Sequence, residues 1–209
     1  MVGVAPKSGH RSRAFLPRPM GLKVISPRQP LPHRQQAKGQ SVDVFEAIRT
    51  LLAVRHYHDK PVPEDVLRRV LEAGRLSASA MNKQPWQFVV VQDPSMLRQL
   101  GTVAQTGPYV SEAPLAIVVA IEPSRFALAD AGRAVQDMLL TAWDAGLGGN
   151  WVGSGGPATK ELLGIPEELD VVAILPFGYP AGATGHGQKT RKPLSEIAHR
   201  ERWGQPFLT

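Results

Sequence analysis

Three apolar runs along the chain mark the strands of a predicted sheet. They cover residues 86–91, 115–121 and 171–177, and each is bounded by proline, glycine or polar residues. Short continuous apolar runs between such breakers are typical of buried strands. We expect the first two strands to be buried on both faces, and a further short strand over residues 150–152.

Apolar residues at helical spacing alternate with these runs and predict the helices. The predicted helices cover residues 42–52, 63–76, 94–100, 127–146 and 157–163. On the long helix over 127–146, we expect Asp130, Arg133 and Asp137 on the polar side. Helices and strands mix without the regular βαβ spacing of a parallel sheet. The pattern therefore indicates one sheet of mixed strand direction with helices on both faces.

Positive charge is concentrated at the N-terminus. The 209 residues carry a formal net charge of +6, but residues 1–42 hold eight Lys or Arg, no acidic residue and six of the 19 prolines. Residues 43–209 are left with 16 basic and 18 acidic residues, a net charge of −2. This part lacks the basic surface that nucleic-acid binding requires. We divide the chain into a basic, proline-rich disordered leader over 1–41 and a folded domain over 42–209.

Three interpretations of the leader stay open. It is a solvated disordered segment, a translated upstream region with Met20 as a later start, or a targeting peptide. The targeting peptide is favoured least, because the segment lacks the apolar core of a secretory signal and shows no clear amphipathic pattern.

The composition excludes several kinds of site. The chain contains no cysteine, which excludes disulfides, thiolate metal sites and cysteine nucleophiles. Its six histidines lack the spacing of metal ligands, so we expect no metal site. The longest uncharged apolar run, 113–121, is far shorter than the ~20 residues of a membrane helix. We therefore expect no membrane association.

The most specific motif is Ser-Ala-Met-Asn-Lys-Gln-Pro-Trp over 79–86, where a helical pattern runs directly into the first strand. Taken singly, Ser79 and Asn82 are typical turn residues that bond their own backbone. The run as a whole offers exposed backbone N–H groups, a side-chain amide and little bulk. Those features suit a planar polar ligand that lies against the main chain.

Basic residues supply two further candidates. Lys189 and Arg191 are separated by one threonine and follow a glycine-rich loop over 178–187. Basic runs are usually solvated, but the position after this loop and the third strand favours a functional role. Arg55 follows the first predicted helix, in a loop over 54–59, where a lone arginine is usually solvated or paired with an acid.

These motifs resemble those of the FMN-dependent nitroreductase family. The run over 79–86 is similar to the family pattern Pro-Ser-x-x-Asn-x-Gln-Pro-Trp, with Ala78 in place of the proline. In that family the small residues approach the flavin ring and the asparagine bonds its polar edge. The resemblance therefore implies flavin contacts by Ala78, Ser79, Ala80 and Asn82.

The basic candidates match the family as well. Arg55 matches a flavin contact near the ribityl chain or the ring, and Lys189 and Arg191 match a Lys-x-Arg that reaches the flavin phosphate. Gly153 lies in a stretch that resembles the turn below the flavin. We assign no residue a catalytic role, because in such proteins the cofactor supplies the chemistry.

One departure from the family pattern concerns the phosphate. Leu51 and Ala53 stand where the family has an arginine and a serine that grip it. A hydrogen bond to a charged group is worth about 1.5–3 kcal/mol, so the loss of these donors would weaken FMN binding by about two to four decades. Arg49 and His56 are nearby candidates for compensation.

The resemblance covers residues 42–209 and implies an α+β fold, a three-layer α-β-α sandwich with a mixed, mostly antiparallel central sheet. It implies a cytoplasmic homodimer with FMN sites lined by both chains, and the helix over 127–146 packed against the partner. NADH or NADPH would reduce the flavin, and a nitroaromatic, a quinone or a related acceptor would reoxidise it in a ping-pong reaction. Two alternatives stay open: other family chemistry (dehalogenation, flavin fragmentation or dehydrogenation), and a flavin-poor binding protein.

Overall fold

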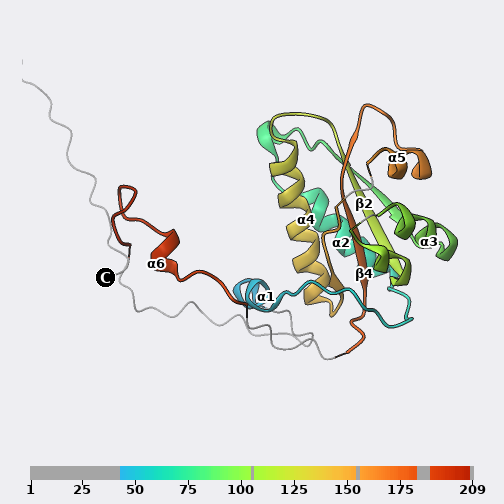
Figure 1. The fold of residues 1–209 in the computed structure, drawn as a ribbon, viewed down its shortest axis with the longest axis horizontal. Helices are drawn as coiled ribbons and strands as arrows, with labels where there is room; N and C mark the ends of the chain where they lie inside the picture. The colour runs from blue at the N-terminus through green and yellow to red at the C-terminus, as the bar shows by residue number, and fades with distance from the viewer. Residues whose placement is uncertain (1–42, 105, 154–155, 183–188, 208–209) are drawn as a thin grey trace, which may run out of the picture. The chain divides into compact units, whose positions relative to one another are not determined.

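In the residues described by the computed structural model, a four-stranded sheet lies between helices (Figure 1). The structure describes residues 43–104, 106–153, 156–182 and 189–207. The predicted leader over 1–41 lies outside the described residues. No helix in these ranges combines the length and the apolar character that a membrane crossing requires.

The sheet is antiparallel throughout its ladders. The strands are β1 (Trp86–Val91), β2 (Leu115–Ile121), β3 (Gly148–Gly149) and β4 (Asp170–Gly178). Their order is β1-β2-β4-β3, and each neighbouring pair is antiparallel. A parallel contact occurs at the isolated bridge between Ala53 and Gly149. The expected mixed, mostly antiparallel sheet is therefore confirmed.

The predicted helices are all present, with ends shifted by up to three residues. The helices are α1 (Val44–Thr50), α2 (Glu64–Leu76), α3 (Pro94–Val103), α4 (Ala127–Asp144), α5 (Pro157–Leu163) and α6 (Leu194–Ile197), with the 3₁₀ helices η1 (Ala80–Asn82) and η2 (Pro108–Glu112). The short helix α6 was not expected, because four residues are too few for a periodic pattern.

The two faces of β2 pack against different helices. Ile117 belongs to one buried cluster with Val70 of α2 and Met138 of α4. Val118 belongs to a second buried cluster with Leu100 of α3. Because successive strand residues point to opposite faces of a sheet, the two clusters lie on opposite sides of β2. This arrangement confirms the expected three-layer sandwich.

Two expectations about strands were wrong. Strand β1 is an edge strand, and although Trp86 and Val91 are buried, Gln87 and Val90 are exposed. The short strand predicted over 150–152 forms at Gly148–Gly149, and within the predicted range Val152 pairs with Ile174 in an isolated antiparallel bridge. Close packing explains its glycines, since a Cβ on Gly148 would lie 2.4 Å from Val54 Cγ2. An apolar run does not reveal whether its strand has one neighbour or two.

Helix α1 buries Ala47 but leaves its larger apolar side chains uncovered. Val44 and Phe45 are 71% and 72% exposed, and Ile48 is 46% exposed, although the spacing predicts a helix with a buried apolar face. Asp43 caps the helix by accepting a hydrogen bond from Phe45 N at 2.9 Å. The helix thus forms with a local cap and presents an apolar surface to its surroundings.

Candidate functional site

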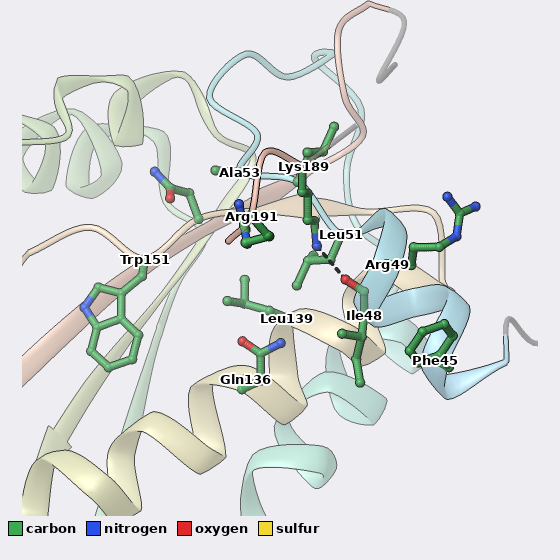
Figure 2. Close-up of a pocket in the computed structure, with 13 residues that line it drawn as sticks. Phe45, Ile48, Arg49, Leu51, Ala53, Gln136, Leu139, Trp151, Lys189 and Arg191 are labelled. Atoms are coloured by element: carbon green, nitrogen blue, oxygen red, sulfur yellow. Dashed lines mark hydrogen bonds between the residues drawn. The ribbon is translucent and has the colours of Figure 1, made fainter. Parts of the chain in front are cut away.

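A pocket of about 900 Å³ lies beside α1 and α4 (Figure 2). Its apolar wall combines side chains of α1, of α4 and of the segments that follow α1 and β3. These residues are Phe45, Ile48, Leu51, Leu52, Ala53, Leu139 and Trp151. Gln136, Asn150, Arg49, Lys189 and Arg191 add polar and charged groups. The pocket therefore offers apolar surface for a ring system together with cationic side chains.

Lys189 and Arg191 reach this pocket from the segment before α6. The Lys189 ammonium donates a hydrogen bond to the Ile48 carbonyl oxygen (Figure 2), and Arg191 Nη1 donates one to the Thr190 carbonyl oxygen at 2.9 Å. Within the described part of the chain, neither cation forms an ion pair with a carboxylate. Burial, and then the charge of Arg191, lowers the pKa of the Lys189 ammonium. The two cations are thus poorly compensated, and an anionic ligand group would relieve that imbalance.

Arg49 and His56 are less suited to bind a phosphate here. Arg49 lines the pocket, but its guanidinium donates two hydrogen bonds to the Glu46 carboxylate, at 2.7 and 2.6 Å. His56 is not among the lining residues, and its Nδ1 lies 3.5 Å from Glu112 Oε2. The compensation that the sequence suggested for Leu51 and Ala53 is therefore not favoured at either residue.

Arg55 lies outside the pocket lining but is connected to it. The Arg55 guanidinium carbon lies 5.8 Å from the centre of the Tyr109 ring. The Tyr109 hydroxyl accepts a hydrogen bond from Asn150 Nδ2, and Asn150 lines the pocket. The sequence analysis did not single out Tyr109 or Asn150, because they are 41 residues apart and neither belongs to a recognisable motif. Gly153 is exposed and does not line the pocket.

The segment with Ala78, Ser79, Ala80 and Asn82 is not part of this pocket. Ala80 N donates a hydrogen bond to Asp130 Oδ1 at 3.0 Å, so the segment contacts one face of α4. Gln136, which lines the pocket, is six residues further along α4 and therefore points about 120° away around the helix axis. One chain thus brings Lys189 and Arg191 together, but holds the 78–82 motif on another face of α4.

Asp130 corrects the expectation that it lies on the polar side of its helix. It is 2% exposed, because its carboxylate turns toward the Ala80 backbone. Asp137 Oδ2 likewise accepts a hydrogen bond from Ser77 Oγ, at 2.5 Å, although Asp137 itself remains exposed. A periodic pattern could not show this, since the partner of Asp130 is a main-chain N–H group that every residue type except proline carries.

Comparisons with known proteins agree with this fold. A family model described as "Nitroreductase family" matches residues 49–122 and 105–179. The chain is 34% identical over 177 residues to a "Putative NADH dehydrogenase/NAD(P)H nitroreductase" of Methanothermobacter thermautotrophicus, covering 79% of this chain and 91% of the relative. A crystal structure of a Bacteroides thetaiotaomicron protein with the same name superposes with a TM-score of 0.71 at 26% identity, covering 77% of this chain and 98% of that one.

More distant relatives carry other activities in their names. The chain is 24% identical over 185 residues to "FMN reductase [NAD(P)H]" of Bacillus subtilis, covering 76% of this chain and 74% of the relative. It is also 24% identical over 212 residues to "Iodotyrosine deiodinase" of Nematostella vectensis, covering 80% of this chain and 78% of the relative.

Proposed function

Since the chain belongs to the nitroreductase family, we propose that it is an FMN-dependent oxidoreductase that takes electrons from NADH or NADPH. Its acceptor is a small molecule such as a nitroaromatic or a quinone. The observation that carries this proposal is the pocket with Lys189 and Arg191 at an apolar wall. The volume of about 900 Å³ is in the usual range for cofactor sites. A flavin ring fits such a wall, and a phosphate dianion fits two poorly compensated cations.

The residues of the chain hold and orient the cofactor. Bound FMN would supply reversible two-electron chemistry, so that NAD(P)H and the acceptor react in turn by a ping-pong scheme. Lys189 and Arg191 bind the phosphate, and Arg55 places positive charge nearer the ring. Leu139 and Trp151 provide apolar surface on one side of the pocket. No general base or nucleophile is needed, and we assign none. The requirement for a nicotinamide donor favours a cytoplasmic location.

A second copy of the chain completes the site in this proposal. The 78–82 motif and the pocket lie on different faces of α4, so the motif of one chain would meet the pocket of the other. Phe45 and Ile48 of α1 are exposed apolar side chains of the pocket wall, and Val44 of the same helix is exposed as well. A partner would cover them. The active form is accordingly a homodimer.

The first experiment is an absorption spectrum of the full-length protein after loading with FMN and removal of the excess. We expect oxidised-flavin bands that NADH or NADPH bleaches without oxygen and that a quinone or nitroaromatic restores. Light scattering during gel filtration should give the mass of two chains. A colourless monomer would contradict the proposal and favour a flavin-poor binding protein.

A second candidate is reductive dehalogenation. The similarity to an iodotyrosine deiodinase over 80% of the chain supports it, and so does the replacement of phosphate-binding residues at Leu51 and Ala53. Iodide release from iodotyrosine by the reduced protein, with no turnover of nitroaromatics or quinones, would favour this activity over the first.

A further inference from the structure

Two carboxylates of α4 hold the segment that enters η1. Asp130 Oδ1 accepts a hydrogen bond from Ala80 N at 3.0 Å, and Asp137 Oδ2 accepts one from Ser77 Oγ at 2.5 Å. The two carboxylates are seven residues apart, which places them on the same face of the helix. The segment from Ser77 to Ala80 is therefore attached to α4 at both ends.

The burial of Asp130 indicates that its contact with Ala80 is specific. A buried carboxylate is strongly unfavourable unless hydrogen bonds compensate it. Asp130 is 2% exposed. Arg133 Nη1 lies at the longer distance of 3.5 Å from Asp130 Oδ1, and the Arg133 side chain is 55% exposed. The Ala80 N–H group is thus the closer partner, and the first turn of α4, where the helix dipole favours an anion, supports the charge.

The residues after Ala80 adopt a conformation that needs such support. Met81, Asn82 and Gln84 have φ angles of 54°, 55° and 50°, in the left-handed region that residues other than glycine rarely adopt. Such conformations persist where the surroundings fix them. Here the Ser79 hydroxyl oxygen accepts a hydrogen bond from Gln84 N at 2.9 Å within the turn, and Asp130 fixes the residue at which the turn begins.

We propose that Asp130 is a positioning residue of the flavin site, which sets the direction of the Ser79–Asn82 backbone and thereby of the Asn82 amide. This inference rests on the proposed function, because the segment contacts a flavin only if the chain binds one. Asp130 acts through its acceptor oxygen rather than through its charge. Asp130 itself does not contact the cofactor, because its carboxylate is buried against the Ala80 main chain.

Two substitutions in the full-length protein distinguish a role of Asp130 as a hydrogen-bond acceptor from a role in filling space. Asp130→Leu has a similar size but no acceptor, whereas Asp130→Asn keeps an oxygen that can accept from Ala80 N–H. We expect Asp130→Leu to weaken FMN binding at least about tenfold and to change the visible circular dichroism of the bound flavin. Asp130→Asn should restore most of both. Fluorescence titration with FMN gives the dissociation constants.

Asp144→Ala is the matched control for general damage to α4. Asp144 lies on the same helix, its side chain is 13% exposed, and its Oδ2 lies 2.7 Å from Arg69 Nη2 of α2. The control should lower the melting temperature and leave the FMN affinity and the dichroism of the flavin unchanged. A purely structural role of Asp130 would give the same result as this control.

Three results with the Asp130 variants would overturn the proposal. The first is an unchanged flavin dichroism and affinity in Asp130→Leu, and the second is an equal loss in Asp130→Asn. If Asp130→Leu does not fold, Asp130→Glu serves instead, because its longer side chain displaces Ala80, and unchanged readouts there are the third. A wild-type protein that binds no FMN would overturn this proposal and the proposed function together, whereas the other results leave the function standing.

Discussion

Replacing both Lys189 and Arg191 with methionine should weaken the binding of FMN far more than that of riboflavin, which has the same ring but no phosphate. A hydrogen bond to a charged group contributes about 1.5–3 kcal/mol. Lys189 is half-buried, so we assign it about 2 kcal/mol, which lies inside that range. Arg191 is exposed and solvent screens its charge, so we assign it about 1 kcal/mol. The sum is about 3 kcal/mol, or roughly two decades in the dissociation constant of FMN.

The assay is a titration of flavin fluorescence with wild-type and double-variant protein, for each ligand. The difference between the two ligands cancels the contribution of the ring and isolates that of the phosphate. Two controls test the assignment. Lys192→Met removes a charge from the same segment outside the pocket lining, and Arg49→Met removes a lining cation that is already paired with Glu46. Both should change the FMN affinity less than about fivefold.

The pH dependence gives an independent check on Lys189. Burial and the nearby charge of Arg191 lower the pKa of its ammonium, so this group loses its proton at a lower pH than an ordinary lysine. The protonated form binds the phosphate, and FMN affinity in the wild type should therefore fall as the pH rises toward that lowered pKa. The Lys189→Met single variant should lack this fall. Equal losses of FMN and riboflavin in the double variant, or no loss at all, would refute the assignment of the phosphate to these two residues.

Three further changes test the site and the fold. Leu51→Arg should tighten FMN binding about tenfold or more in the same titration, because it restores a charged donor to the pocket wall. An unchanged affinity would mean that leucine at this position does not weaken FMN binding. Burial raises the pKa of Tyr57, so its stabilising contribution is complete below the unfolded-state pKa of about 10 and is lost as the pH rises above it, by about 1.4 kcal/mol per pH unit. Urea unfolding at pH 8–11 should therefore show a smaller advantage of wild type over Tyr57→Phe at the alkaline end, and a constant advantage would contradict this reasoning. Gly148→Ala should destabilise the fold by about 1–3 kcal/mol, because its Cβ would meet Val54 Cγ2 at 2.4 Å, and an unchanged melting temperature would exclude that clash.

The central strands could be predicted from the sequence because their surroundings are uniform. Every residue of β2 is buried, so its apolar run reflects the strand faithfully. The run of β1 is nearly as apolar, yet β1 lies at the edge of the sheet with Gln87 and Val90 exposed. Strand order depends on pairing between distant segments, and local composition carries little information about it.

The candidate site was predictable in its residue types but not in its placement. Lys189 and Arg191 form a recognisable pair, and the structure brings them to one pocket. The link from Arg55 through Tyr109 to Asn150 joins three segments by side-chain contacts that have no periodic or motif signature. Asp130 shows the same limit, since its polarity predicted exposure and only the fold supplies the backbone N–H group that buries it.

The resemblance assigns the 78–82 motif, Lys189 and Arg191 to one flavin site. Helix α4 explains why a single chain keeps the motif apart from the pocket that contains the two cations. Asp130 and Asp137 use one face of the helix to hold the segment leading into η1, whereas Gln136 and Leu139 use another to line the pocket. The two sets of side chains lie about 100–180° apart around the helix axis, so a ligand on one face of the helix does not reach the other set. In the proposed homodimer, a site that needs both sets of residues takes one set from each chain. The uncovered apolar side chains of α1, at the rim of the same pocket, supply the surface through which such a partner would bind.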